Sequence, residues 1–134
     1  MKNLIVGTLL ILLSGCAMVD AYFMAGFDPN EYLLVDDVRS TAQVSVNQCE
    51  NREQMNSIVN SMYLTATKLK NYAQFIPHNE KTIPLAESLY DEVYKLQTRY
   101  QSPEKIGKAY CKMKLNIIEK SAETIQEVLG SKPR

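Results

Sequence analysis

An apolar seam at helical spacing is the feature that most limits how this chain can fold. Its members lie alternately four and three residues apart: Met55, Val59, Met62, Ala66, Leu69, Ala73 and Ile76. Side chains at these steps share one face of an α-helix, and that face has to be buried against other elements. No segment alternates apolar and polar residues over more than a few positions, so strands are not expected. The seam therefore predicts an all-α chain of packed helices.

Another helix is predicted before the seam. Asp28-Pro29-Asn30-Glu31 has the form of a helix start, with Asp28 as N-cap, Pro29 in the first turn and Glu31 placed to return a hydrogen bond. Its apolar face consists of Val35, Val38, Ala42, Val46 and Cys49. This face does not share a phase with the seam, which predicts a break or a kink near Asn51.

A third helix is predicted after the seam. Pro77-His78-Asn79 ends the seam helix, and Thr82-Ile83-Pro84 starts the next one. The apolar set of that helix is Ala86, Leu89, Val93, Leu96 and Tyr100. Together with a last helix that follows residue 101, these segments predict an antiparallel helical bundle of three to four helices.

The last helix is expected to be capped by Ser102-Pro103-Glu104 and to present a wide apolar face. One stripe of this face holds Ile106, Tyr110, Met113 and Ile117, and the adjoining stripe holds Cys111, Leu115, Ile118, Ala122, Ile125 and Leu129. Gly130 suits the position just past the helix end, and residues 131–134 are expected to be a frayed tail.

The N-terminus has a pattern of its own. Lys2 precedes an apolar run over residues 4–13, about half the length of a membrane span. Leu13-Ser14-Gly15-Cys16 follows, and these residues resemble the lipobox of bacterial lipoprotein precursors. The resemblance implies that residues 1–15 are a signal peptide, that a peptidase cuts before Cys16, and that acyl chains on Cys16 anchor the mature protein in a lipid bilayer.

The same resemblance implies a domain organisation and a location. Residues 16–27 are then the lipidated N-terminus and its tether, which is apolar here although many lipoproteins have a polar one. The helical spacing predicts the bundle domain at residues 28–134. In enterobacterial lipoproteins an Asp directly after the lipidated Cys retains the protein at the inner membrane, and this chain has Ala17 there. The implied location is the periplasmic face of an outer membrane. The apolar tether either packs on the domain, lies in the membrane interface, or is covered by a partner.

Lipidation of Cys16 also bears on the other two cysteines. The chain has three cysteines, and removing Cys16 leaves Cys49 and Cys111 as an even pair in an oxidising compartment. A bond between them would close a long loop and contribute about 4 kcal/mol. The alternatives are two buried free thiols or a redox pair.

The search for chemistry predicts no enzyme, no cofactor and no metal site. The single histidine, His78, stands in a predicted turn without a carboxylate at a spacing that would orient it. Asp36 and Asp37 point to different helix faces, so they cannot act as a catalytic pair. The 15 basic and 15 acidic residues balance, which disfavours a nucleic-acid partner.

Two surface features remain as candidates for binding. Lysines follow one side of the last helix (Lys105, Lys108 and Lys112, with Lys114 and Lys120 nearby), while the first helix is acidic at Asp28, Glu31, Asp36 and Asp37. The lysines either pair with neighbouring carboxylates or contact anionic headgroups or an acidic partner.

Tyrosines are the second feature. Tyr90 and Tyr94 are one turn apart, and further phenols stand at Tyr63, Tyr72, Tyr100 and Tyr110. They form either the rim of the core or a protein-contact patch. The resulting hypothesis is a non-enzymatic protein-binding or accessory module of the cell envelope with an envelope protein as its partner. The alternatives are a structural or lytic envelope-bridging lipoprotein, and a small apolar ligand bound between the helices.

Overall fold

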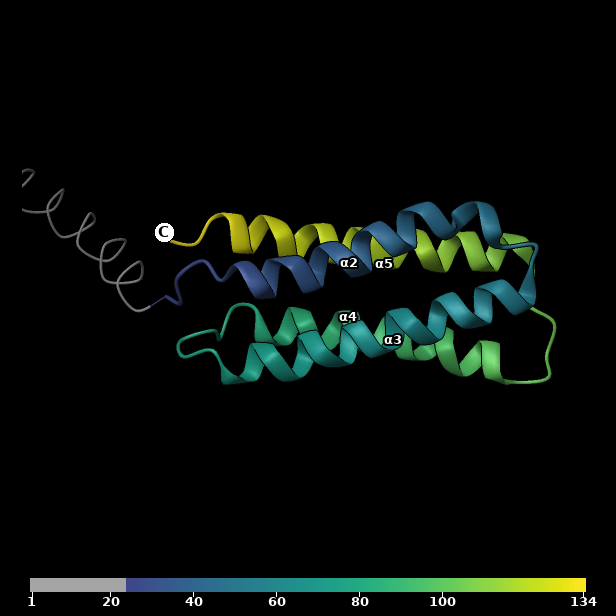
Figure 1. Ribbon diagram of the computed structural model, residues 1–134, viewed down its shortest axis with the longest axis horizontal. Helices are drawn as coiled ribbons and strands as arrows, with labels where there is room; N and C mark the ends of the chain where they lie inside the picture. The colour runs from purple at the N-terminus through teal and green to yellow at the C-terminus, as the bar shows by residue number, and fades with distance from the viewer. Residues whose placement is uncertain (1–23) are drawn as a thin grey trace, which may run out of the picture.

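Four antiparallel helices make up most of residues 24–134, the part of the chain that the computed structural model describes (Figure 1). They are α2 (Pro29–Ser45), α3 (Arg52–Phe75), α4 (Ile83–Gln101) and α5 (Lys108–Gly130), with a short 3-10 helix, η1 (Val46–Gln48), after α2. Each helix packs against the one that follows it, and α5 returns beside α2. The prediction of an all-α antiparallel bundle is confirmed.

The bundle has two unlike ends. The terminal end, as we call it, contains residues 24–28, the α3–α4 turn and the C-terminus (Figure 1). The opposite, disulfide end contains η1 and the α4–α5 loop (Figure 1).

The predicted seam lies in the centre of the bundle. Its members from Met55 to Ala73 are at most 1% exposed, and Ile76, just beyond α3, is half-buried. The apolar sets predicted for α2 and α4 are also buried, apart from the half-buried Val46. The helical spacing of apolar residues therefore identified nearly the whole interior.

The chain reverses direction between the apolar face of α2 and the seam of α3, which differ in helical phase. Helix α2 ends at Ser45, η1 follows, and Asn51 caps α3 by accepting a hydrogen bond from the Gln54 amide at 3.0 Å. The predicted break near Asn51 is confirmed, and it is a full hairpin.

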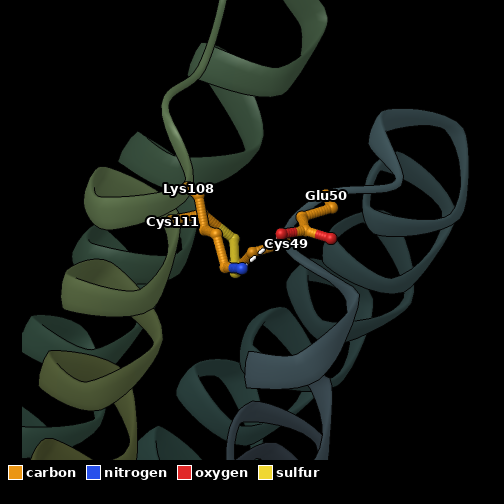
Figure 2. Close-up of a disulfide and its surroundings, with 4 residues drawn as sticks. All are labelled: Cys49, Glu50, Lys108 and Cys111. Carbon is orange, nitrogen blue, oxygen red and sulfur yellow. Dashed lines mark hydrogen bonds and ion pairs between the residues drawn. A yellow bond between two sulfur atoms is a disulfide. The ribbon is translucent and has the colours of Figure 1, made fainter.

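This hairpin brings Cys49 to α5. The Cα atoms of Cys49 and Cys111 are 5.8 Å apart and the two cysteines form a disulfide, as predicted (Figure 2). Glu50 and Lys108 form an ion pair beside it. A covalent bond and an ion pair thus join the α2–α3 hairpin to the first turn of α5.

The predicted start of the last helix is wrong. Ser102 is the C-cap of α4, and α5 begins at Lys108 with Gly107 as its N-cap. The guanidinium group of Arg52 donates hydrogen bonds to the carbonyl oxygens of Tyr100, Ser102 and Glu104 at 3.1, 2.5 and 2.6 Å. These bonds satisfy carbonyls at the end of α4 and hold the connection out of helical geometry.

The wide apolar face predicted for this helix is wrong in part. The stripe from Cys111 to Leu129 is buried, but Met113 and Ile117 of the other stripe are 48% and 38% exposed. Ile106 and Tyr110 of that stripe are half-buried against the core. In an antiparallel four-helix bundle one face of α5 meets the interior, so Met113 and Ile117 remain at the surface. Gly130 is the last residue of α5 rather than a residue beyond it, and no described glycine has a positive φ.

None of the helices in residues 24–134 is long and apolar enough to cross a membrane. Cys16 and the predicted signal peptide lie outside the described residues. The tether is described only from Met24 onward, where Ala25 is 5% exposed and Phe27 is half-buried against Tyr32. This part of the tether packs on the bundle.

Candidate functional site

Three tyrosines gather on the surface between α3 and α4. Tyr90 and Tyr94 lie one turn apart on α4, and the antiparallel packing of α3 places Tyr63 beside both. The Tyr63 ring centroid is 5.7 Å from that of Tyr90 and 6.0 Å from that of Tyr94, and the rings of Tyr90 and Tyr94 are stacked at 6.0 Å. We call Tyr63, Tyr90 and Tyr94 the tyrosine cluster.

The tyrosine cluster is ordered by its own contacts and remains accessible. Tyr63 and Tyr90 are half-buried, with 3.3 Å between their hydroxyl oxygens, and the Lys70 Nζ lies 4.2 Å from the Tyr90 ring centroid. Tyr94 is 47% exposed. The hydrogen bond with the Tyr63 hydroxyl raises the pKa of the Tyr90 phenol, and burial raises it further. The phenol is therefore neutral at physiological pH and keeps its hydroxyl proton.

A surface cavity of about 330 Å³ extends the cluster toward the disulfide end. It is lined by Tyr94, Lys95, Thr98, Arg99, Ser102 and Glu104. Arg99 and Glu104 form an ion pair of 2.7 Å at its edge. The Tyr94 ring beside the Arg99–Glu104 ion pair is suited to receiving a side chain of a protein partner, with the polar groups around the rim of the cavity.

Tyr72, Tyr100 and Tyr110 belong to the rim of the core. The Tyr72 hydroxyl donates to Asp28 at 3.1 Å, Tyr100 is 4% exposed, and Tyr110 is half-buried with Arg99 above its ring. Tyr63 and Tyr90 also pack against the core, whereas Tyr94 is exposed. The contact-patch interpretation therefore stays a prediction for the tyrosine cluster.

The lysines of the last helix are mostly engaged with carboxylates. Lys105 lies in the loop before α5, so it does not extend a helical stripe. Three of the others form ion pairs: Lys108 with Glu50, Lys114 with Glu92 at 3.2 Å, and Lys120 with Glu123 at 2.6 Å. Hydrogen bonding to Lys108 lowers the pKa of Glu50. These ion pairs agree with the predicted pairing of the lysines with neighbouring carboxylates.

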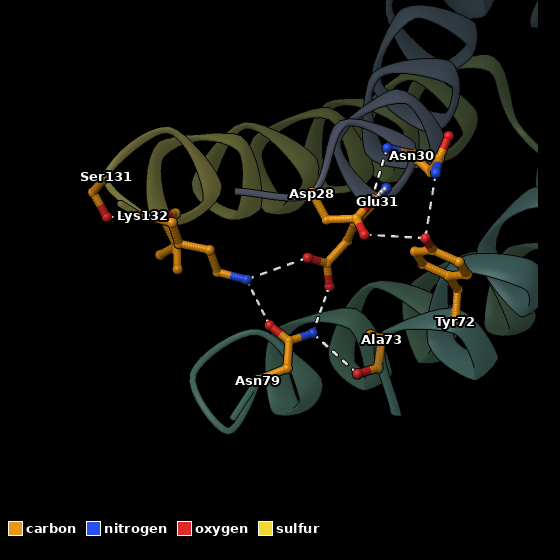
Figure 3. A network of polar contacts seen from close by, with 9 residues as sticks. Asp28, Asn30, Glu31, Tyr72, Ala73, Asn79, Ser131 and Lys132 are labelled. Atoms are coloured by element: carbon orange, nitrogen blue, oxygen red, sulfur yellow. Dashed lines mark hydrogen bonds and ion pairs between the residues drawn. The ribbon is translucent and has the colours of Figure 1, made fainter. Parts of the chain in front are cut away.

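Glu31, predicted as part of an acidic face, is instead fully buried in a polar network at the terminal end (Figure 3). Its carboxylate accepts from Asn79 Nδ2 at 2.7 Å and pairs with Lys132 Nζ at 3.2 Å. Lys132 also donates to Asn79 Oδ1 at 2.5 Å, and Asn79 Nδ2 donates to the Ala73 carbonyl at 3.0 Å. We call Glu31, Asn79 and Lys132 the polar clamp.

The polar clamp explains two corrections to the sequence interpretation. Asp28 caps α2 as predicted, accepting from the amides of Asn30 and Glu31 at 2.8 and 3.0 Å, but the Glu31 side chain does not return a bond to the cap. Residues 131–134 are not a frayed tail, since Lys132 is 4% exposed and the Pro133 carbonyl accepts from the Phe27 amide at 2.9 Å. The only hint in the sequence was a lysine in the tail, which is not a specific signal.

The residues considered for metal binding or catalysis lie apart from one another. In residues 24–134 no group of three or more His, Cys, Asp and Glu residues could hold a metal ion. Asp36 accepts from Gln126 and Asp37 from Thr65, both at 2.9 Å, so these carboxylates serve different helix contacts. His78 occupies the α3–α4 turn with a φ of 59°, and its carbonyl accepts from the Ala25 amide.

Comparisons with known proteins add no relative. No protein-family model matches the chain, and it matches neither a curated protein nor a solved structure. The functional interpretation therefore depends on the sequence and on the geometry described above.

Proposed function

We propose that this chain is a lipoprotein of the cell envelope, held on the periplasmic face of an outer membrane by acylated Cys16, and that its bundle binds another envelope protein without catalysing a reaction. The observation that carries the proposal is the tyrosine cluster with its adjoining cavity. Tyrosine provides a large, rigid contact area together with a hydroxyl group, which is why it is enriched at protein interfaces.

The cysteines support the anchor. The chain has three cysteines, and Cys49 and Cys111 are bonded to each other. This pairing leaves Cys16, at the end of the lipobox, available for a lipid. It also suits an exported protein, because disulfides persist in oxidising compartments.

The alternative of a bound apolar ligand has less support. A small apolar ligand would need space between the helices, but the seam side chains are almost fully buried, and a cavity of about 600 Å³ lies instead along the outer face of α5.

Site-specific photo-crosslinking in intact cells tests the proposal. A photoreactive phenylalanine analogue at Thr98, which lines the cavity beside Tyr94, should yield one defined complex in the membrane fraction. The same analogue at Met113 is the matched control, since this position is also exposed but lies on α5.

Dependence on the tyrosine cluster makes the result specific. Removing an interface hot spot costs 2 kcal/mol or more, equivalent to about 30-fold in affinity, so Tyr94→Ala should abolish the complex formed from position 98. A complex that persists in Tyr94→Ala, or that forms equally from position 113, would refute the tyrosine cluster as the binding surface.

A further inference from the structure

The chain enters the bundle at a fixed point of the terminal end (Figure 1). The Ala25 amide donates to the His78 carbonyl, and the Phe27 amide donates to the Pro133 carbonyl, both at 2.9 Å. Residues 25–27 are thereby held against the α3–α4 turn and the C-terminal tail. The free length of any tether from Cys16 therefore ends at about Met24.

This length restricts where an anchored bundle can stand. Eight residue steps separate Cys16 from Met24, and a fully extended chain covers about 28 Å in that number of steps. Helix α5, with 23 residues, is about 35 Å long. The terminal end therefore stays within reach of the bilayer surface, whereas the disulfide end does not have to approach it.

The rim of the terminal end carries an unusually exposed aromatic side chain. Phe75, the last residue of α3, is 86% exposed, more than any other large apolar residue in the described part of the chain. The seven residues between Cys16 and Met24 include Met18, Val19, Tyr22 and Phe23. Aromatic side chains are enriched where proteins meet the headgroup region of a bilayer, so Phe75 and the tether have compatible chemistry.

The polar clamp keeps this rim in place. Asn79, four residues after Phe75, is bonded to Glu31 of α2, to Lys132 after α5 and to the Ala73 carbonyl of α3 (Figure 3). The turn is thus tied to three other segments of the bundle. The exposed Phe75 side chain therefore stands beside a turn that these contacts hold in place.

We propose that the terminal end rests on the bilayer, with Phe75 inserted into its headgroup region, so that the bundle stands with its disulfide end away from the membrane. The proposal depends on the proposed lipidation of Cys16. The tyrosine cluster, near the middle of α3 and α4, is then raised above the lipid surface and open to a protein partner from the side.

The absence of tryptophan from the sequence allows a direct test with single-tryptophan variants. Phe75→Trp reports on the terminal end. Leu64→Trp is a matched control on the same outward face of α3, eleven residues earlier and 60% exposed, and Val44→Trp reports on α2 near the disulfide end, at 68% exposure. The full-length protein, purified from membranes with its lipid, is reconstituted into phosphatidylcholine–phosphatidylglycerol vesicles with brominated acyl chains.

We expect the fluorescence of Phe75→Trp to shift to the blue and to be quenched several-fold more strongly than that of Leu64→Trp, with no quenching of Val44→Trp. Equal, weak quenching of all three would overturn the docking. Quenching of Leu64→Trp as strong as that of Phe75→Trp would mean that the bundle lies on its side, which also overturns the proposal.

Mass spectrometry of the Cys16 peptide and flotation of the vesicles test the anchor separately. If the Phe75→Trp variant is lipidated and floats but its fluorescence is not quenched, the docking is refuted and the anchor stays intact. A protein without acyl chains refutes both proposals.

Discussion

Replacing Lys132 by Met should destabilise the bundle by about 3 kcal/mol or more, because it leaves a buried carboxylate without its cation. The side chains of Glu31 and Lys132 are 0% and 1% exposed, so water cannot replace the lost partner. Glu31 would keep the hydrogen bond from Asn79 at 2.7 Å, which does not neutralise the charge. The length of Met matches that of the lysine stem, which limits any cavity.

Urea unfolding and thermal unfolding, each followed by circular dichroism at 222 nm, measure this loss. In a domain of this size a loss of about 3 kcal/mol in unfolding free energy lowers the Tm by about 15 °C. The slope of the unfolding free energy against urea concentration should not change if the unfolded state is unaffected. Lys120→Met is the control, because the Lys120 side chain is 73% exposed although it also pairs with a glutamate, and its Tm should not change.

A double-mutant cycle separates the ion pair from packing. Glu31→Gln with Lys132→Met removes both charges, so the double variant should lose less stability than the sum of the two single variants. If Lys132→Met destabilises no more than Lys120→Met does, the tail is frayed after all and the polar clamp is not a stabilising element.

Three further predictions address other parts of the bundle. Cys49→Ala with Cys111→Ala should lower the free energy of unfolding by about 4 kcal/mol through the loop of 62 residues; urea curves that coincide with those of the oxidised parent would contradict this. Glu92→Gln should cost about 0.5–1 kcal/mol at pH 7. Hydrogen bonding to Lys95, with a further contribution from Lys114, lowers the Glu92 pKa, so the stabilisation is complete above the unfolded pKa and is lost as the pH falls below about 4; a cost that persists at pH 2 would refute the ion-pair origin. Leu115→Ala should cost about 2–5 kcal/mol and Ile117→Ala much less, since these side chains are 0% and 38% exposed; equal losses would mean that both stripes of α5 are in the core.

The sequence predicted the parts of the fold that depend on periodicity. The seam of α3, the apolar faces of α2 and α4, and the break near Asn51 all follow from the spacing of apolar residues, which local geometry determines. The disulfide followed from the cysteine count once Cys16 was assigned to a lipid. The hairpin then placed Cys49 beside Cys111, which a straight helix would not have done.

The errors arise where tertiary contacts outweigh local signals. Ser102-Pro103-Glu104 resembles a helix start, but Arg52, some fifty residues away, binds the carbonyls at the end of α4 and delays α5 to Lys108. Glu31 fits a capping box, but its carboxylate turns inward because Asn79 and Lys132 meet it there.

The tyrosine cluster was predicted in part. The helical spacing of Tyr90 and Tyr94 was visible in the sequence, whereas the arrival of Tyr63 from α3 required knowledge of the helix order. The same limit applies to the second apolar stripe of α5, because periodicity alone does not say how many neighbours a helix has.

The disulfide also has a mechanical consequence. It closes a loop that contains all of α3 and α4, whereas α2, η1 and the part of α5 after Cys111 lie outside this loop. A force applied between a membrane anchor and the C-terminus could therefore extend only about 50 of the described residues, while the enclosed hairpin would bear no tension along its backbone. If a partner bound to the tyrosine cluster, which lies on that hairpin, stretching of the terminal segments would not pull the binding surface apart, and the complex would fail at its interface before α3 and α4 were drawn out.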